Sequence, residues 1–179
     1  MPAIEACGVP PASFLDRYTT GGAYADCYVT DIARSVSQSE YVEAFYTTGL
    51  FKLERLILRL LVSRPSTDEG ARKLAAGEKD TFAAWHVESR SDGELLVAAG
   101  RTRSWLMTVP DASKDRPATR LFFGSAVLPA KGRDGQPSLG PGFSSLLGFH
   151  KLYSRALLQA ARSRLESQTS TEKTHGPGS

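Results

Sequence analysis

The sequence predicts an α+β fold in which a curved antiparallel sheet wraps around a long C-terminal helix. Helical periodicity occurs in two regions, one early and one at the end of the chain, and alternation of apolar and polar residues fills the region between them. Turn signals separate the alternating segments, as in strands that are joined by hairpins. A long helix with one apolar stripe must bury that stripe, and the concave face of a twisted sheet can cover it.

Length and composition indicate one globular domain. The chain has 179 residues, of which 41% are hydrophobic and 23% are charged, and a single domain usually has roughly 100–200 residues. This usage excludes a largely disordered chain, a collagen-like repeat and a small disulfide scaffold. The net charge of +3 is too small to indicate a nucleic-acid partner.

Both ends of the chain look less ordered than its middle. Prolines stiffen the N-terminal part without an apolar periodicity, and the last residues are rich in Ser, Thr, Gly and Pro. Such composition is typical of segments that cannot bury enough apolar surface to fold. We therefore expect a flexible leader at 1–22, a single domain at 23–166 and a disordered tail at 167–179.

Nothing in the sequence indicates export or a membrane span. The N-terminus lacks the basic start and apolar core of a signal peptide. The most apolar stretch, Leu50–Val62, is interrupted by charged residues and is too short to cross a bilayer. Two cysteines are present, Cys7 and Cys27; a disulfide between them stays open as an alternative, but nothing else suggests secretion. We expect a cytoplasmic protein.

The first elements are a strand and two or three helices. Strand-forming residues favour a strand at Tyr24–Ile32. Ser37 and Glu40 have the spacing of a capping box and predict a helix start. Leucines at helical spacing predict a second helix within 50–61, which Pro65 ends. A second capping box, Ser66 to Glu69, predicts a short helix that stops at Gly77.

The remaining elements are strands and one helix. Alternation and turn residues predict four antiparallel strands, at Thr81–Arg90, Glu94–Ala99, Arg103–Val109 and Thr119–Leu128. A long loop at Pro129–Gly142 follows, of a length often found in lids. Apolar residues at helical spacing then predict a long helix at Ser144–Glu166.

Two stretches carry a resemblance to a known family. Gly148–Arg155 and Gly100–Met107, together with the order of elements, resemble an uncharacterised bacterial domain family. That family is placed in or near the helix-grip superfamily of START lipid-transfer domains, pollen-allergen-like proteins and polyketide cyclases. The resemblance implies a fold and a cavity between the sheet and the final helix, and it implies no reaction.

Common catalytic and cofactor motifs are missing. The three histidines have no paired spacing and no neighbouring cysteine pair, so we expect no metal. There is no Gly-x-Ser-x-Gly elbow and no phosphate-binding glycine loop with its lysine. The sequence therefore indicates no cofactor.

His86 is the leading candidate for chemistry. It lies in the middle of a predicted strand, and an imidazole that lined a cavity could act as a general base or a ligand donor. Glu88, Asp26 and Tyr28 are weaker candidates for the same role. The alternative is a strand histidine with one edge in solvent, and strand parity does not decide which of Trp85 and His86 points inward.

The expected cavity combines aromatic walls with a few polar groups, as ligand pockets usually do. Arg103 shares strand parity with Trp105 and could hold a carboxylate, or it could extend its head group to water. The expected ligand-binding residues are Trp85, His86, Arg103, Trp105, Phe122, Phe123, Phe149 and Tyr153.

Three function classes follow. We expect first a binding protein for a small apolar or amphipathic molecule. One alternative is a structural or interaction protein with a filled core, and a homodimer would support this alternative. The other is a cyclase- or dehydratase-type enzyme that uses His86. A measurable cavity would favour the first class over the second.

Overall fold

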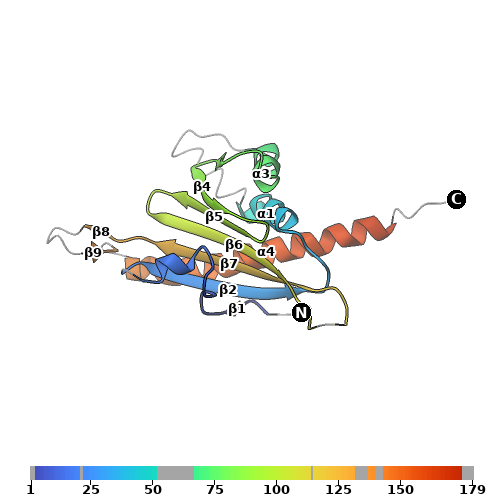
Figure 1. The fold of residues 1–179 in the computed structure, drawn as a ribbon, viewed down its shortest axis with the longest axis horizontal. Coiled ribbons are helices and arrows are strands. Elements are labelled where there is room, and N and C mark those ends of the chain that lie inside the picture. The colour runs from blue at the N-terminus through green and yellow to red at the C-terminus, as the bar shows by residue number, and fades with distance from the viewer. Residues whose placement is uncertain are drawn as a thin grey trace.

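The computed structural model describes residues 3–20, 22–51, 67–113, 115–131, 137–139 and 143–174. The second predicted helix lies outside these residues from position 52 onward, as does Ser66. The described chain forms a seven-stranded antiparallel sheet with the C-terminal helix packed on it (Figure 1). This confirms the predicted α+β class and the antiparallel sheet.

The sheet has the strand order β1-β2-β7-β6-β5-β4-β3. All of its neighbouring strands are antiparallel. The strands are β1 (Glu5–Ala6), β2 (Tyr24–Ile32), β3 (Thr81–Phe82), β4 (Trp85–Arg90), β5 (Glu94–Ala99), β6 (Thr102–Pro110) and β7 (Thr119–Val127). A separate two-stranded sheet pairs β8 (Ala130–Lys131) with β9 (Pro137–Ser138).

The predicted strand at Thr81–Arg90 is two strands in the structure. Ala83 has a φ of 53°, a left-handed conformation that ends a strand. The chain therefore turns back, and Phe82 of β3 pairs with Trp85 of β4. The result is a short hairpin at the edge of the sheet.

The first short helix begins as its capping signal predicts, whereas the second has its N-cap at Thr67 and not at the predicted Ser66. Helix α1 (Gln38–Tyr46) has the capping box between Ser37 and Glu40 that the sequence predicts. Helix α3 (Asp68–Ala75) follows the N-cap Thr67, whose side chain accepts a hydrogen bond from the Gly70 amide. Gly77 follows α3 with a φ of 79°, which suits a glycine at a helix end.

Helix α4 (Phe143–Thr174) is the long C-terminal element. It contains the whole range of the predicted helix at Ser144–Glu166 and continues to Thr174. The first part of the segment expected to be a disordered tail is therefore helical. In Figure 1 this helix runs along the sheet and extends past its edge.

The inner face of the sheet is the face that packs against α1 and α4. Alternation along β2, β6 and β7 places one apolar set on this face. It meets apolar residues of both helices in the main core. This core contains Tyr28, Ile32, Leu106, Leu121 and Phe123 from the sheet with Tyr41, Phe45, Leu157, Leu158 and Leu165 from the helices.

The outer face of the sheet is covered in part by residues 3–20, which we call the N-terminal segment. Its strand β1 pairs with β2, and its Leu15 is completely buried beside Trp105 and Cys27. A 3-10 turn at Asp16–Tyr18 follows. The sequence predicts a flexible leader here, but strand pairing and burial of Leu15 tie most of it to the sheet.

Two glutamates hold the N-terminal segment in place. Glu94 on β5 accepts hydrogen bonds from the Phe14 amide and the Trp105 indole, both at 2.8 Å. Glu88 on β4 accepts a hydrogen bond from the Tyr18 hydroxyl and pairs with Arg103 at 2.6 Å. Hydrogen bonds to charged groups contribute more than neutral ones. These contacts therefore hold the segment in place together with its apolar packing.

Candidate functional site

A cavity of about 140 Å³ lies between the inner face of the sheet and α4. It is where the sequence predicts a site, between an antiparallel surface and the C-terminal helix. Its lining comes from α1, β4, β6, β7, α4 and the residue Phe51. The lining residues are Phe45, Phe51, Trp85, Thr102, Arg103, Ser104, Phe123, Ser125, His150, Tyr153, Ser154 and Leu157.

Local periodicity places these residues together. On β7, Phe123 and Ser125 are two apart and share the inner face. Ser104 on β6 pairs directly with Ser125. On α4, His150, Tyr153 and Leu157 follow one another at three and four residues, so they form one stripe of the helix.

One side of the cavity is an aromatic wall. The Phe45 ring lies 4.9 Å from the Phe123 ring and 6.0 Å from the Phe51 ring, measured between centroids. Trp85 adds a half-buried indole whose Nε1 is buried without a hydrogen-bond partner among the described residues. A buried donor of this kind is costly unless an acceptor reaches it.

The other side is a polar cluster of Asp26, Ser125 and His150. The Ser125 hydroxyl donates to Asp26 Oδ1 at 2.6 Å. His150 Nε2 lies 2.8 Å from Ser125 Oγ and 3.4 Å from Asp26 Oδ2. Because the Ser125 proton is directed to the carboxylate, its oxygen accepts from His150, which places a proton on Nε2.

Two tyrosines complete the shell around the Asp26 carboxylate. The hydroxyls of Tyr24 and Tyr28 donate to Asp26 Oδ2 at 3.1 Å and 3.4 Å. Tyr24 also meets the His150 ring edge to face, with centroids 6.1 Å apart. Asp26, Tyr24 and Tyr28 alternate along β2, so a single strand supplies the carboxylate and two of its donors.

The cluster keeps Asp26 ionised. Burial alone would raise the pKa of this carboxyl, but hydrogen bonds from His150 and Ser125 outweigh it and lower the pKa below its ordinary value. Burial and the Asp26 charge together raise the pKa of Tyr28 to about 12, and they raise the pKa of Tyr24 as well. Both phenols therefore stay protonated near neutral pH and continue to donate.

The geometry of the cluster differs from that of a serine nucleophile. In a Ser-His-Asp triad, the two ring nitrogens of the histidine face different partners, and the serine proton passes to the histidine. Here His150 Nε2 faces both Ser125 and Asp26, and the Ser125 proton points to the carboxylate. The arrangement is suited to anchoring a polar group and not to activating Ser125.

Half of the expected ligand-binding residues line the cavity: Trp85, Arg103, Phe123 and Tyr153. The Arg103 guanidinium itself is engaged elsewhere, since it pairs with Glu88 and lies 5.3 Å from the centre of the Tyr18 ring. Its head group thus helps to hold the N-terminal segment.

The other expected residues lie away from the cavity. Trp105 is fully buried on the outer face, with the Phe122 ring 6.1 Å away. Phe149 on α4 is 68% exposed and stacks on Tyr153. His86 is exposed on β4, while its neighbour Trp85 faces inward. The enzyme alternative therefore loses its leading candidate.

Asp26 and Tyr28 of the polar cluster are among the weaker candidates of the sequence analysis, whereas Ser104, Ser125 and His150 are not. His150 is weighed there only as a metal ligand, and Ser104 and Ser125 look like ordinary strand residues. Two signals could have found them. His150 lies three residues before Tyr153 on the same helical stripe, and serines within otherwise apolar strands mark polar positions on a buried face.

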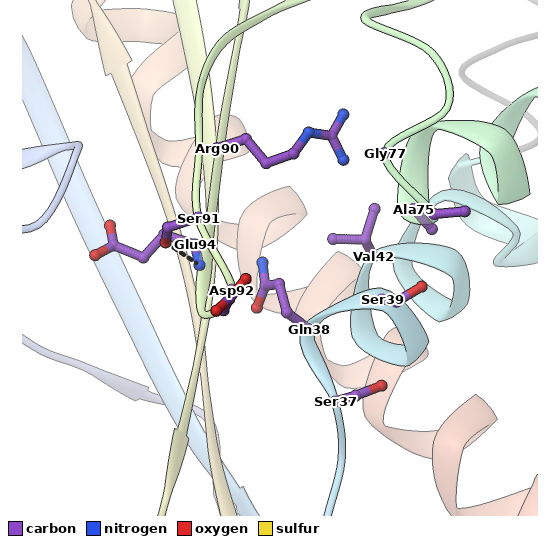
Figure 2. Close-up of a pocket in the computed structure, with 11 residues that line it drawn as sticks. Ser37, Gln38, Ser39, Val42, Ala75, Gly77, Arg90, Ser91, Asp92 and Glu94 are labelled. Carbon is purple, nitrogen blue, oxygen red and sulfur yellow. Dashed lines mark hydrogen bonds between the residues drawn. The ribbon is translucent and has the colours of Figure 1, made fainter.

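A larger groove of about 300 Å³ lies between the start of α1, the end of α3 and the β4–β5 turn (Figure 2). Two of its charged side chains, Arg90 and Glu94, serve the fold. Arg90 donates to the carbonyls of Leu74 and Lys79, at 2.6 Å and 3.2 Å, and so caps the end of α3. The carboxylate of Glu94 points away from the groove in Figure 2. We therefore place the candidate site in the cavity beneath α4.

Comparison of the chain with protein-family models, with curated proteins and with solved structures gives no match. Within the described ranges, no three His, Cys, Asp or Glu side chains gather closely enough to hold a metal ion. No helix in the described part of the chain is both long and apolar enough to cross a membrane. The function must therefore be argued from the cavity itself.

Proposed function

We propose that the protein binds a small amphipathic molecule in the cavity between the sheet and α4. The observation that carries this proposal is the division of the cavity lining. Phe45, Phe51 and Phe123 offer an apolar wall, while Ser125 and His150 offer polar atoms backed by Asp26. A mostly apolar pocket with a few oriented polar groups is the usual form of a small-molecule site.

The volume limits the size of the ligand. Pockets for drug-sized molecules are usually about 300–1,000 Å³, and an engineered cavity of about 150 Å³ accepts benzene. A cavity of about 140 Å³ therefore suits a single ring or a short chain and not a whole lipid. It also exceeds the room for one or two waters, at about 30 Å³ each, which favours binding over a filled core.

The charge of the polar cluster selects the polar group of the ligand. Asp26 is ionised and lies directly behind Ser125 and His150. Arg103, the arginine of the lining, is already paired with Glu88. The Asp26 charge would repel a ligand carboxylate, so a ligand whose polar group is a hydroxyl or an amine is favoured.

We also infer that the fold is of the helix-grip type, with a curved sheet around α4. The order of elements, the packing of α4 on the inner face and the cavity between them support this inference. An experimental structure superposed on START and pollen-allergen-like domains would test it. Superposition of the sheet with α4 on the opposite face would contradict it.

Three ligands of the same ring size test the proposal: benzyl alcohol, benzylamine and benzoate. Binding to the full chain is followed by calorimetry and by ligand-detected NMR. We expect benzyl alcohol or benzylamine to bind at least ten times more tightly than benzoate. Absence of binding by all three, for a chain with a folded circular dichroism spectrum, would contradict the proposal.

Two variants of β6 locate the binding. Ser104→Leu places a large side chain in the cavity lining and should abolish binding of the preferred ligand. Thr108→Val changes a buried residue of the same strand that is not part of the lining and should leave binding unchanged. Equal binding by wild type and Ser104→Leu would place the ligand elsewhere.

A further inference from the structure

Two thiols face each other where the N-terminal segment meets the sheet. The Sγ atoms of Cys7 and Cys27 lie 3.3 Å apart and share a hydrogen bond. Cys7 directly follows β1, and its amide donates to the Cys27 carbonyl at 3.0 Å. The register pairs Ala6 with Tyr28, so one step further along the ladder brings Cys7 opposite Cys27.

This position satisfies the backbone requirement for a disulfide. Residues directly opposite each other in an antiparallel pair have Cα atoms about 4.5–5.5 Å apart. Disulfides span Cα separations of about 4.4–6.8 Å. A bond between the two sulfurs therefore needs rotation of the side chains and no movement of the strands.

We propose that Cys7 and Cys27 form a redox site, in which a reversible disulfide fastens the N-terminal segment to β2. The two thiols have different surroundings. This suits a site in which one thiol reacts with the oxidant and the other then attacks the oxidised sulfur. Cys7 is half-buried at the edge of the sheet, whereas Cys27 is 2% exposed within the outer-face core. An oxidant from solvent thus reaches Cys7 first.

The electrostatics support the same division of roles. The hydrogen bond with Cys27 lowers the pKa of the Cys7 thiol, against the effect of burial and with a smaller contribution from Arg120. The same hydrogen bond and burial raise the pKa of the Cys27 thiol. Because the thiolate is the nucleophile, Cys7 reacts first and Cys27 resolves the intermediate.

With a hydroperoxide as oxidant, the chemistry has two steps. The Cys7 thiolate attacks one oxygen of hydrogen peroxide, the O–O bond breaks, and the leaving hydroxide takes up a proton to become water. Cys27 then attacks the sulfur of the Cys7 sulfenic acid, loses its proton, and expels the hydroxyl group as a second water. Two thiols and one peroxide give one disulfide and two waters, and the two electrons go to the peroxide.

The disulfide would change how firmly the outer face is covered. It closes a loop between positions 20 residues apart, and closing a loop of that size stabilises the folded state by restricting the unfolded chain. For a domain of this length, we expect the melting temperature to rise by roughly 5–10 °C. The N-terminal segment should also become more resistant to proteolysis.

The test uses the full chain, reduced and then treated with graded hydrogen peroxide. Intact mass, maleimide labelling and non-reducing electrophoresis follow the thiols, and calorimetry follows the melting temperature. We expect a monomer that loses two hydrogens, takes up no maleimide and melts at a higher temperature. Dithiothreitol should restore the starting values of all of these measurements.

Single variants separate the two roles. Cys27→Ser should leave a Cys7 sulfenic acid that dimedone traps, and Cys7→Ser should leave Cys27 reduced at the same dose of peroxide. If Cys27→Ser does not fold, the test rests on Cys7→Ser, whose substitution is at a half-buried position. Oxidation of Cys27 in this variant is then compared with its oxidation in wild type. Labelling of both thiols after treatment of wild type, or crosslinking between chains, would overturn the proposal.

Discussion

Leu15 closes against Gly124 so tightly that position 124 has no room for a methyl group. A Cβ added there would lie 2.5 Å from Leu15 Cδ2 and 3.0 Å from both the Trp105 ring and the Asp26 carbonyl. The N-terminal segment and the centre of the sheet therefore fit together at this point. Gly124 has no left-handed φ, so backbone conformation does not require a glycine here. The close approach of Leu15 and Trp105 does.

Gly124→Ala should lower the free energy of unfolding by about 1–3 kcal/mol, because the added methyl group overpacks the outer face. Urea unfolding measures the change. Gly148→Ala is the control, since nothing lies within 4 Å of a Cβ at this helical position, and it should be neutral or slightly stabilising. The double variant Leu15→Ala/Gly124→Ala should be less destabilised than the sum of the two single variants. A Gly124→Ala variant as stable as wild type would contradict the close approach.

Glu94→Ala should release the N-terminal segment. It removes the acceptor of the Phe14 amide and leaves the buried Trp105 indole without its partner, at a cost of about 2–3 kcal/mol. Limited proteolysis should then cleave within residues 3–20 faster than in wild type. Glu78→Ala, at an exposed position outside this contact, should leave the cleavage rate unchanged. Equal rates for Glu94→Ala and wild type would show that the contact does not hold the segment.

Asp26→Asn should weaken the dependence of stability on pH in acid. The pKa of Asp26 is lowered on folding, so its contribution is present above the unfolded value of about 3.9 and is lost as the pH falls through the folded value. Wild type should therefore lose stability below about pH 4 more steeply than the variant. Chemical unfolding at several pH values between neutral and pH 3 measures this difference. If wild type and variant lost stability equally steeply in acid, the lowered pKa of Asp26 would be contradicted.

The same variant should also be less stable at neutral pH. The carboxylate accepts from Ser125, Tyr24 and Tyr28, and an amide NH₂ group cannot replace an acceptor oxygen in that shell. We expect a loss of about 2–3 kcal/mol at pH 7. Asp92→Asn, on the exposed β4–β5 turn, is the matched control and should retain wild-type stability.

Ser37→Ala should destabilise the start of α1 by about 1 kcal/mol, the usual loss on removal of an N-cap. Its side chain accepts a hydrogen bond from the Glu40 amide, and the Glu40 carboxylate accepts one from the Ser37 amide. Ser39→Ala, at an exposed position in the same first turn, should change stability by less. Thermal unfolding compares the two variants, and equal losses would argue against the capping box.

Local signals made the fold class predictable. The strand at Tyr24–Ile32 is observed with the predicted bounds, because strand-forming residues and flanking turns act within a few positions. The capping box at Ser37 is confirmed for the same reason. The N-terminal segment was harder to predict, because Leu15 is ordered by Trp105 and Gly124, which lie far away in the sequence.

The site was only half predictable because both faces of the sheet are apolar. Strand parity separates Phe122 from Phe123, but it does not say which face the helices cover. Phe123 lies under α4, while Phe122 and Trp105 lie in the core formed with the N-terminal segment. Apolar residues such as Phe14 and Leu15 in the leader were the available hint that the outer face also has a cover.

The pairing of β2 with β7 in the sheet has a consequence for how the molecule folds during synthesis. Their register joins Tyr24 to Val127 and Ile32 to Thr119, so most of the chain must be synthesised before the two strands meet. Contacts between such distant segments slow folding, because closing the long intervening loop costs conformational entropy before the contacts can stabilise the fold. A nascent chain that ends before residue 119 presents β2 without its main neighbour, and assembly of the sheet waits for the second half of the polypeptide.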